Sequence, residues 1–159
     1  MNDVANTDEL RELYRELILD HARNPRHFGK LESATHSAEG INPLCGDKLK
    51  LYLHLDDSST IIDAAFEGSG CAISVASASL LTDAISGVSA DSAEGFVDAV
   101  TASLSGSGNA VQDIADERLE KLRALQGVRE FPARVKCATL AWHALRSALR
   151  RDSAPASTE

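Results

Sequence analysis

Two periods of apolar spacing run along the chain, and each predicts a different kind of element. Near the N-terminus, apolar side chains follow the spacing of one helical face: Leu10, Leu13, Tyr14, Leu17 and Ile18. Thr7 or Asp8 can cap this helix. The pattern stops before Asn24-Pro25, because a residue before proline disfavours helical geometry. We therefore expect a first helix between these two signals.

Strict alternation over residues 48–55 predicts a half-buried strand. Four leucines face one way: Leu49, Leu51, Leu53 and Leu55. The residues between them face the other way: Lys48, Lys50, Tyr52 and His54. Residues 56–59 are typical of a hairpin loop and residues 60–67 of a returning strand, while residues 36–41 predict a shorter strand before a turn. This pattern favours a small antiparallel sheet of about three strands.

Helical patterns dominate the remainder. We expect one helix from Ser69 or Gly70 to about Ser86, and a second from Asp91 to about Leu104. A flexible loop follows over residues 105–109. A helix or helix pair is indicated before Gly127 by Val111, Ile114, Leu119, Leu122 and Leu125. Pro132 suits the first turn of a last helix, whose buried face carries Val135, Ala138, Trp142, Leu145 and Leu149. The fold class is therefore α+β, a sheet packed with helices.

Length and charge limit the classes of function. The 159 residues fit one domain, which we place at 8–151, between a flexible N-terminus (1–7) and a disordered polar tail (152–159). The net charge of −8 argues against nucleic acid and anionic membranes as partners. No apolar run approaches the roughly 20 residues of a membrane-spanning helix. The acidic, polar N-terminus is unlike a signal peptide, so we expect a cytoplasmic protein.

Three cysteines carry the candidate chemistry, and their odd number favours metal binding or thiol chemistry over a disulfide framework. Cys45 and Asp47 flank one glycine and can present a soft and a hard ligand. Cys71 is expected in the first turn of a helix, where the helix dipole lowers a thiol pKa. Cys137 follows Arg134 by one helical turn. Three thiolates and a carboxylate are enough for a tetrahedral zinc site.

The alternative is that all three cysteines are core residues, since free cysteine is often buried. Cys45 and Cys71 lie at glycine turns outside the apolar periodicity, and Cys137 lies beside the cations Arg134 and Lys136. These settings favour a shared metal or thiol site. No histidine has the spacing of a nucleophile and its base.

Three motifs in order resemble one known family. They are Asn-Pro-Leu-Cys-Gly-Asp at 42–47, Gly-Ser-Gly-Cys-Ala-Ile-Ser at 68–74 and Phe-Pro-Ala-Arg-Val-Lys-Cys-Ala-Thr-Leu at 131–140. The chain resembles the IscU/SufU family of iron–sulfur cluster assembly proteins, which implies a SufE/IscU-like fold. Lys136 stands where scaffold-type IscU proteins carry histidine, and an extra segment lies around 105–127. Both features favour the SufU branch.

The resemblance implies a zinc ion held by Cys45, Asp47, Cys71 and Cys137. It implies a partner, a SufS-type cysteine desulfurase carrying pyridoxal phosphate, and a downstream iron–sulfur assembly complex. Cys45 would leave the zinc, accept a persulfide sulfur and pass it on, which makes the chain a sulfurtransferase. The loop setting of Cys45 agrees with this role, because a loop can move without disturbing the core. We expect Arg134 to hold Asp47 or to steady a thiolate during the exchange.

Two other functions remain open at this point. The same thiolates could hold iron, which would make the chain a scaffold for iron or an iron–sulfur cluster. Lys136 in place of histidine removes one expected cluster ligand and counts against this. A structural zinc adaptor is the second alternative, and Asp47 counts against it because closed structural sites usually prefer cysteine or histidine.

Overall fold

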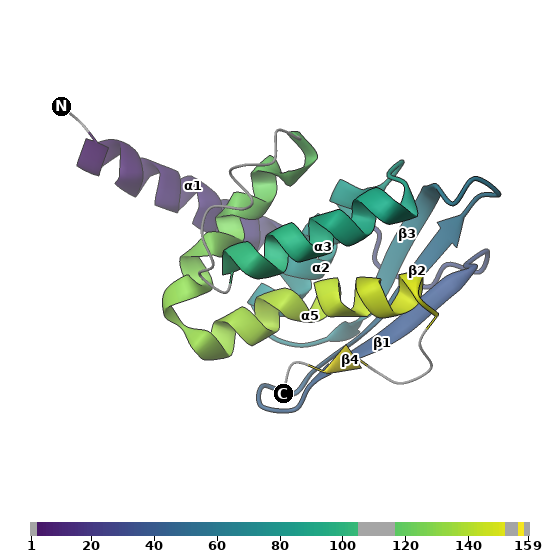
Figure 1. Cartoon of the computed structure of the whole chain (residues 1–159). Coiled ribbons are helices and arrows are strands. Elements are labelled where there is room, and N and C mark those ends of the chain that lie inside the picture. Colours follow the sequence, from purple (N-terminus) through teal and green to yellow (C-terminus); the bar gives the residue numbers. More distant parts are fainter. Residues whose placement is uncertain (1–2, 105–116, 152–155, 158–159) are drawn as a thin grey trace.

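The computed structural model describes residues 3–104, 117–151 and 156–157 (Figure 1). The predicted loop at 105–109, and Val111 and Ile114, lie outside these residues. The elements in chain order are α1 (Asp3–Arg23), β1 (His36–Asn42), β2 (Asp47–Leu55), β3 (Ile61–Ser69), α2 (Ala72–Ile85), α3 (Ala90–Leu104), the 3₁₀ helix η1 (Glu117–Glu130), α5 (Pro132–Leu149) and β4 (Ala156–Ser157). None of the described helices has both the length and the apolar character to span a membrane.

The sheet has the strand order β3-β2-β1-β4. Strands β1, β2 and β3 form the predicted antiparallel sheet, which confirms the α+β class. The short strand β4 pairs with β1 in parallel, so the tail contributes to the sheet although the sequence predicts no element there. Two paired residues are too few for a periodic pattern to show.

Helices cover one face of the sheet (Figure 1). Helices α2 and α5 pack on that face, α3 packs on α5, and α1 packs on α2 and η1. The predicted inward leucines of β2 meet these helices, since Leu51 and Leu53 are fully buried and Leu49 nearly so. Trp142 of α5 is also fully buried in this core. The face of β2 that carries the alternating leucines is therefore the face that the helices cover.

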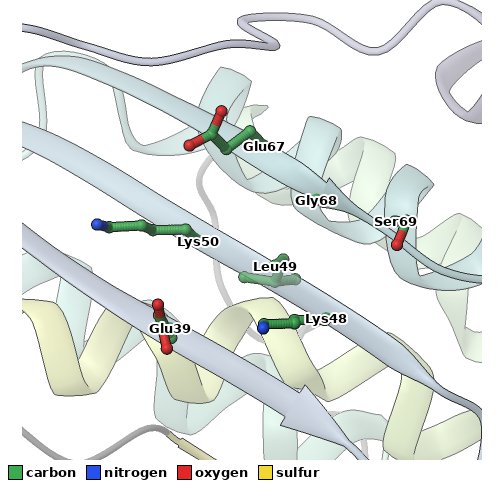
Figure 2. A pocket seen from close by; sticks show the side chains of 7 residues that line it. All are labelled: Glu39, Lys48, Leu49, Lys50, Glu67, Gly68 and Ser69. Carbon is green, nitrogen blue, oxygen red and sulfur yellow. The ribbon is translucent and has the colours of Figure 1, made fainter.

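The opposite face of the sheet carries charge. In register, Lys50 of β2 lies opposite Glu39 of β1 and Glu67 of β3. Figure 2 shows these side chains around a shallow pocket of about 240 Å³. Tyr52, predicted to face outward, is buried, because Lys50 lies over its ring and its hydroxyl donates a hydrogen bond to Glu67. Lys50 and Glu67 thus cover Tyr52 on this face of the sheet.

Several element boundaries differ from the predictions. Helix α1 begins at Asp3 rather than at a cap at Thr7 or Asp8. The element predicted to stop before Gly127 continues to Glu130 as a 3₁₀ helix. Cys71 precedes the first turn of α2 as its N-cap. Local sequence signals predict the presence of a helix or strand more accurately than the residues at which it begins and ends.

Candidate metal centre

Asp47 is the central residue of the candidate site. It begins β2 directly opposite Asn42, the last residue of β1, and the loop 43–46 joins the two strands. Gly46 in this loop has φ of +72°, a conformation that suits glycine. The turn therefore places Cys45 beside a carboxylate that is only 1% exposed.

Three candidate ligands meet at this point. The sulfur atoms of Cys45 and Cys137 and a carboxylate oxygen of Asp47 all lie within 4.8 Å of one another. Cys45 is exposed and Cys137 is buried. These three residues thus connect the loop 43–46 to the first half of α5. Cys45 is the member of the group that is exposed to solvent.

Cys71 joins the cluster through Asp47. Its backbone N–H donates to Asp47 Oδ1 at 2.8 Å, and its Sγ lies 3.9 Å from Asp47 Oδ2. As N-cap of α2, its Sγ also accepts a hydrogen bond from the Ser74 backbone N–H at 3.5 Å. The side chain that caps the helix is therefore the one that approaches the carboxylate. All four candidate ligands proposed from the sequence lie at one end of the sheet.

The surroundings of Asp47 fit a bound cation. Its oxygens accept hydrogen bonds from the Cys71 N–H and the Asn42 amide, and Asp47 is in none of the ion pairs between described residues. A buried carboxylate without a counter-charge is costly. Thiolate and carboxylate donors together suit a divalent metal such as zinc. The residues present therefore form a possible metal site.

Burial raises the pKa of the Cys137 thiol, and the neighbouring Asp47, Cys45 and Cys71 raise it further. Of the two cations near Cys137 in the sequence, Arg134 is exposed and Lys136 is half-buried, whereas Cys137 itself is fully buried. A metal ion at the cluster would supply the missing positive charge and favour the thiolate.

Arg134, expected from the sequence to contact the site, lies in the first turn of α5. It is exposed and forms no ion pair with another described residue. None of the hydrogen bonds of Asp47 reaches it. The structure therefore does not bring Arg134 to Asp47.

Two further residues border the site that the sequence does not single out. Asn42 is fully buried and its Nδ2 contacts both Asp47 Oδ2 at 3.2 Å and Cys137 Sγ at 3.5 Å. Gly70 lies so close that a Cβ there would be 2.5 Å from Asp47 Oδ1. Both stand inside the cysteine motifs, but nothing in the local pattern shows which atoms they face.

The pocket of Figure 2 is separate from this cluster. It lies on the outer sheet face and meets the site only at Lys48 and Ser69, the neighbours of Asp47 and Gly70. None of the four candidate ligands lines it. The candidate chemistry therefore lies at the strand ends and not in the pocket.

Residues 13–138 match the NifU-like N-terminal domain family. The chain belongs to this family. A relative from Bacillus subtilis, the zinc-dependent sulfurtransferase SufU, is 41% identical over 96% of this chain and 97% of its own. The iron–sulfur cluster assembly scaffold protein IscU of Streptococcus pyogenes is 38% identical, covering 91% of this chain and 87% of its own.

Solved structures agree with this assignment. The putative iron–sulfur cluster assembly scaffold protein for the SUF system from Fervidobacterium islandicum has a TM-score of 0.73 at 33% identity, over 84% of this chain and 94% of its own. The NifU-like N-terminal protein of Brucella abortus has a TM-score of 0.77 at 26% identity, over 91% and 99%. The family resemblance seen in the three sequence motifs is thus confirmed for this NifU-like chain.

Proposed function

We propose that this chain is a zinc-dependent sulfurtransferase that accepts persulfide sulfur from a SufS-type cysteine desulfurase for iron–sulfur cluster assembly. One observation carries the proposal: an exposed cysteine, Cys45, lies against a buried carboxylate and a buried cysteine, Asp47 and Cys137. The similarity to the Bacillus SufU relative supports it and favours the SufU branch. The reaction needs reduced thiols, which suits the cytoplasm.

Zinc would be held by Cys45, Asp47, Cys71 and Cys137. When bound, it keeps thiolates deprotonated without oxidising them. Asp47 is a harder donor than a fourth thiolate, so it suits a site that exchanges one ligand. The Cys71 N–H holds this carboxylate at 2.8 Å, which keeps it in place whether or not Cys45 is bound.

The sulfur transfer is a thiol–disulfide type of exchange. The Cys45 thiolate attacks the outer sulfur of the persulfide on the desulfurase cysteine, the bond between the two persulfide sulfurs breaks, and the desulfurase cysteine leaves as a thiolate. The transferred sulfur keeps its proton, and no external oxidant or reductant is consumed. Cys45 then carries the persulfide to a downstream iron–sulfur assembly complex.

Exposure selects Cys45 as the acceptor. The attacking sulfur must align with a sulfur–sulfur bond on a second protein. Cys137 is fully buried in α5, and Cys71 is tied to the start of α2 by its capping bond. Cys45 is exposed in the loop 43–46, so only this sulfur can reach out without moving a helix.

Arg134 belongs to the proposal as a residue that acts during the exchange. Its exposed place in the first turn of α5, three residues before Cys137, lets it meet a partner at the rim of the site. There it would steady the thiolate charge when Cys45 leaves. The Arg134→Ala variant should fold normally but should stimulate the desulfurase poorly. Full stimulation of the desulfurase by this variant would show that Arg134 is a surface residue with no role in the exchange.

A scaffold for iron or an iron–sulfur cluster is the second candidate. The Streptococcus relative named as a scaffold, 38% identical, favours it. Lys136 beside Cys137 argues against it, because an ammonium group with its proton is no metal ligand. A structural zinc adaptor is less consistent with an exposed ligand cysteine.

Metal analysis separates these functions. Protein purified without added iron should be colourless and hold about one zinc per chain, as a four-donor site requires. Stable iron binding with the absorption of a cluster would favour the scaffold instead.

Mass spectrometry tests the relay itself. After mixing with desulfurase and cysteine, one sulfur, about 32 Da, should be added at Cys45. Cys45→Ala should abolish stimulation of the desulfurase. Sulfur appearing reproducibly on Cys71 or Cys137, with Cys45→Ala still active, would contradict the relay. Zinc binding without any stimulation would favour the adaptor.

A further inference from the structure

We propose that Asn42 is a positioning residue that holds Asp47 and Cys137 in a fixed arrangement while Cys45 exchanges. The inference rests on the proposed function and deepens it. Asn42 is no ligand in this proposal. It acts through the two buried ligand residues that its amide group touches.

The contacts of Asn42 are specific. Its side chain is fully buried, and its one amide nitrogen donates to Asp47 Oδ2 at 3.2 Å and to Cys137 Sγ at 3.5 Å. An amide nitrogen has two N–H donors, so both are used. One side chain therefore joins a ligand of β2 to a ligand of α5.

The acceptors determine which way the amide is turned. With a metal ion bound, Asp47 as a carboxylate and Cys137 as a thiolate only accept hydrogen bonds, so a flipped amide would place its oxygen against two negative groups. The unflipped orientation leaves the Asn42 Oδ1 buried without a hydrogen-bond partner among the described residues. A buried acceptor without a partner costs stability, so this orientation needs a compensating interaction. The two hydrogen bonds donated by the amide nitrogen provide it.

The backbone explains why Asn42 can stay in place when Cys45 moves. Asn42 ends β1 and pairs with Asp47 across the sheet. Cys45 lies between them in the loop 43–46, outside the paired strands. The loop can therefore change shape while the Asn42–Asp47 pair at its base stays in register.

The charge at the site gives this arrangement its purpose. Asp47 and Cys137 carry like charges as metal ligands, and they repel each other whether or not Cys45 is bound. Two N–H donors directed at these groups reduce that repulsion. Partners that orient metal ligands in this way typically affect metal affinity when they are removed.

Three variants test the proposal. Asn42→Ala removes both donors, Asn42→Asp keeps the shape but replaces the donors with acceptors, and Asn42→Ser restores a single donor. Asn24→Ala is the matched control, because the Asn24 side-chain amide donates to Asp20 at the exposed end of α1 and to no other described residue. Each variant is first checked for folding by circular dichroism and thermal unfolding.

Two measurements are then made on each folded variant. The first is zinc affinity, by competition with a chelator. The second is the visible spectrum after cobalt(II) substitution, which reports the geometry of the ligands. We expect Asn42→Ala and Asn42→Asp to lose about 10- to 100-fold in zinc affinity and to change the cobalt bands. Asn42→Ser should recover part of both, and Asn24→Ala should match the parent protein.

The outcomes distinguish the inference from the function beneath it. If the parent protein binds neither zinc nor cobalt, the proposed function fails and this inference fails with it. If the parent binds metal and the Asn42 variants keep its affinity and its cobalt spectrum, only the role of Asn42 is overturned. Lower thermal stability with an unchanged cobalt spectrum would make Asn42 a purely structural residue and would also overturn the proposal. The Asn42→Ser variant decides the question if the other two do not fold.

Discussion

At the scale of single residues, Asp47 is held in place by hydrogen bonds and close packing, and it forms no ion pair with another described residue. The Cys71 N–H donates to its Oδ1 at 2.8 Å. This approach depends on Gly70, because a Cβ at that position would lie 2.5 Å from the same oxygen. Glycine at position 70 is therefore part of how the chain presents its carboxylate ligand.

Gly70→Ala should displace the Asp47 carboxylate and reduce zinc affinity by about tenfold or more, as other disturbances of ligand orientation do. Gly95→Ala is the matched control, because Gly95 lies in α3 where a Cβ would point into open space. That control should bind zinc normally and gain about 0.5–1 kcal/mol of stability from its helical position. Chelator competition and thermal unfolding measure both effects. Equal zinc affinities in the two variants would show that Gly70 does not control the carboxylate.

At the scale of elements, α2 is anchored by polar side chains within the core. Ser77 of α2 donates a hydrogen bond to the Ala138 carbonyl at 2.5 Å and accepts one from Trp142 Nε1 at 3.2 Å. All three residues are buried, and Ala138 directly follows Cys137. One hydroxyl group thus connects the helix that starts at Cys71 to the helix that carries Cys137.

Ser77→Ala should destabilise the fold by about 1–3 kcal/mol, because it leaves the Trp142 indole N–H buried without a partner and removes a second hydrogen bond from the Ala138 carbonyl. Ser92→Ala, at an exposed position of α3, is the control and should change stability by less than about 0.5 kcal/mol. Urea unfolding gives both values. A loss in Ser77→Ala no larger than in the control would mean that water replaces both partners.

Helix α1 is joined to α2 by a buried histidine. His21 Nδ1 lies 2.7 Å from Ser79 Oγ, and only 1% of His21 is exposed. Burial lowers the pKa of His21, and the Arg26 cation lowers it further. Folding therefore favours the neutral imidazole.

Stability should fall as the pH drops below about 6.5, where the unfolded chain binds a proton that folded His21 resists. His21→Gln should show a shallower loss between neutral and mildly acidic pH. His36 and His143, whose pKa values burial also lowers, act in the same direction in both proteins, so they cancel in the comparison. Urea unfolding at a series of pH values measures the difference. If the free energy of unfolding changes with pH in the same way for both proteins, His21 does not contribute to the pH dependence of stability.

At the scale of the whole molecule, the candidate ligands come from three distant parts of the chain. Cys45 and Asp47 belong to the connection of β1 and β2, Cys71 to the start of α2, and Cys137 to α5. A metal ion bound to all of them would link the sheet to the two helices that cover it. Metal binding should therefore contribute to the stability of the whole fold.

Chelation of zinc should lower the melting temperature by roughly 10 °C, the shift expected for a few kcal/mol in a chain of this size. Adding zinc back should restore it, and adding magnesium should not, because magnesium prefers oxygen ligands. Cys137→Ala should resemble the chelated protein, since it loses a buried ligand. Differential scanning calorimetry measures each shift. A melting temperature that is independent of zinc would show that the site does not support the fold.

Much of the architecture could be predicted from local patterns. The alternation of the β2 leucines set the buried face of the sheet, and Pro132 marked the start of α5. These features follow from the side-chain periods of strands and helices and from the geometry of proline, which act over a few residues. Motif resemblance also indicated the family and the four candidate ligands.

The sequence by itself thus determined the main helices and the three antiparallel strands, the family and the candidate ligand types, but not the short strand β4. Only the tertiary structure decided that Cys45 is exposed and Cys137 buried, that Arg134 forms no hydrogen bond with Asp47 among the described residues, and that Asn42 and Gly70 border the carboxylate. The physical reason is that burial and hydrogen-bond partners depend on segments far apart in the chain. The Asn42 amide meets a sulfur 95 positions away, and no local period encodes that distance.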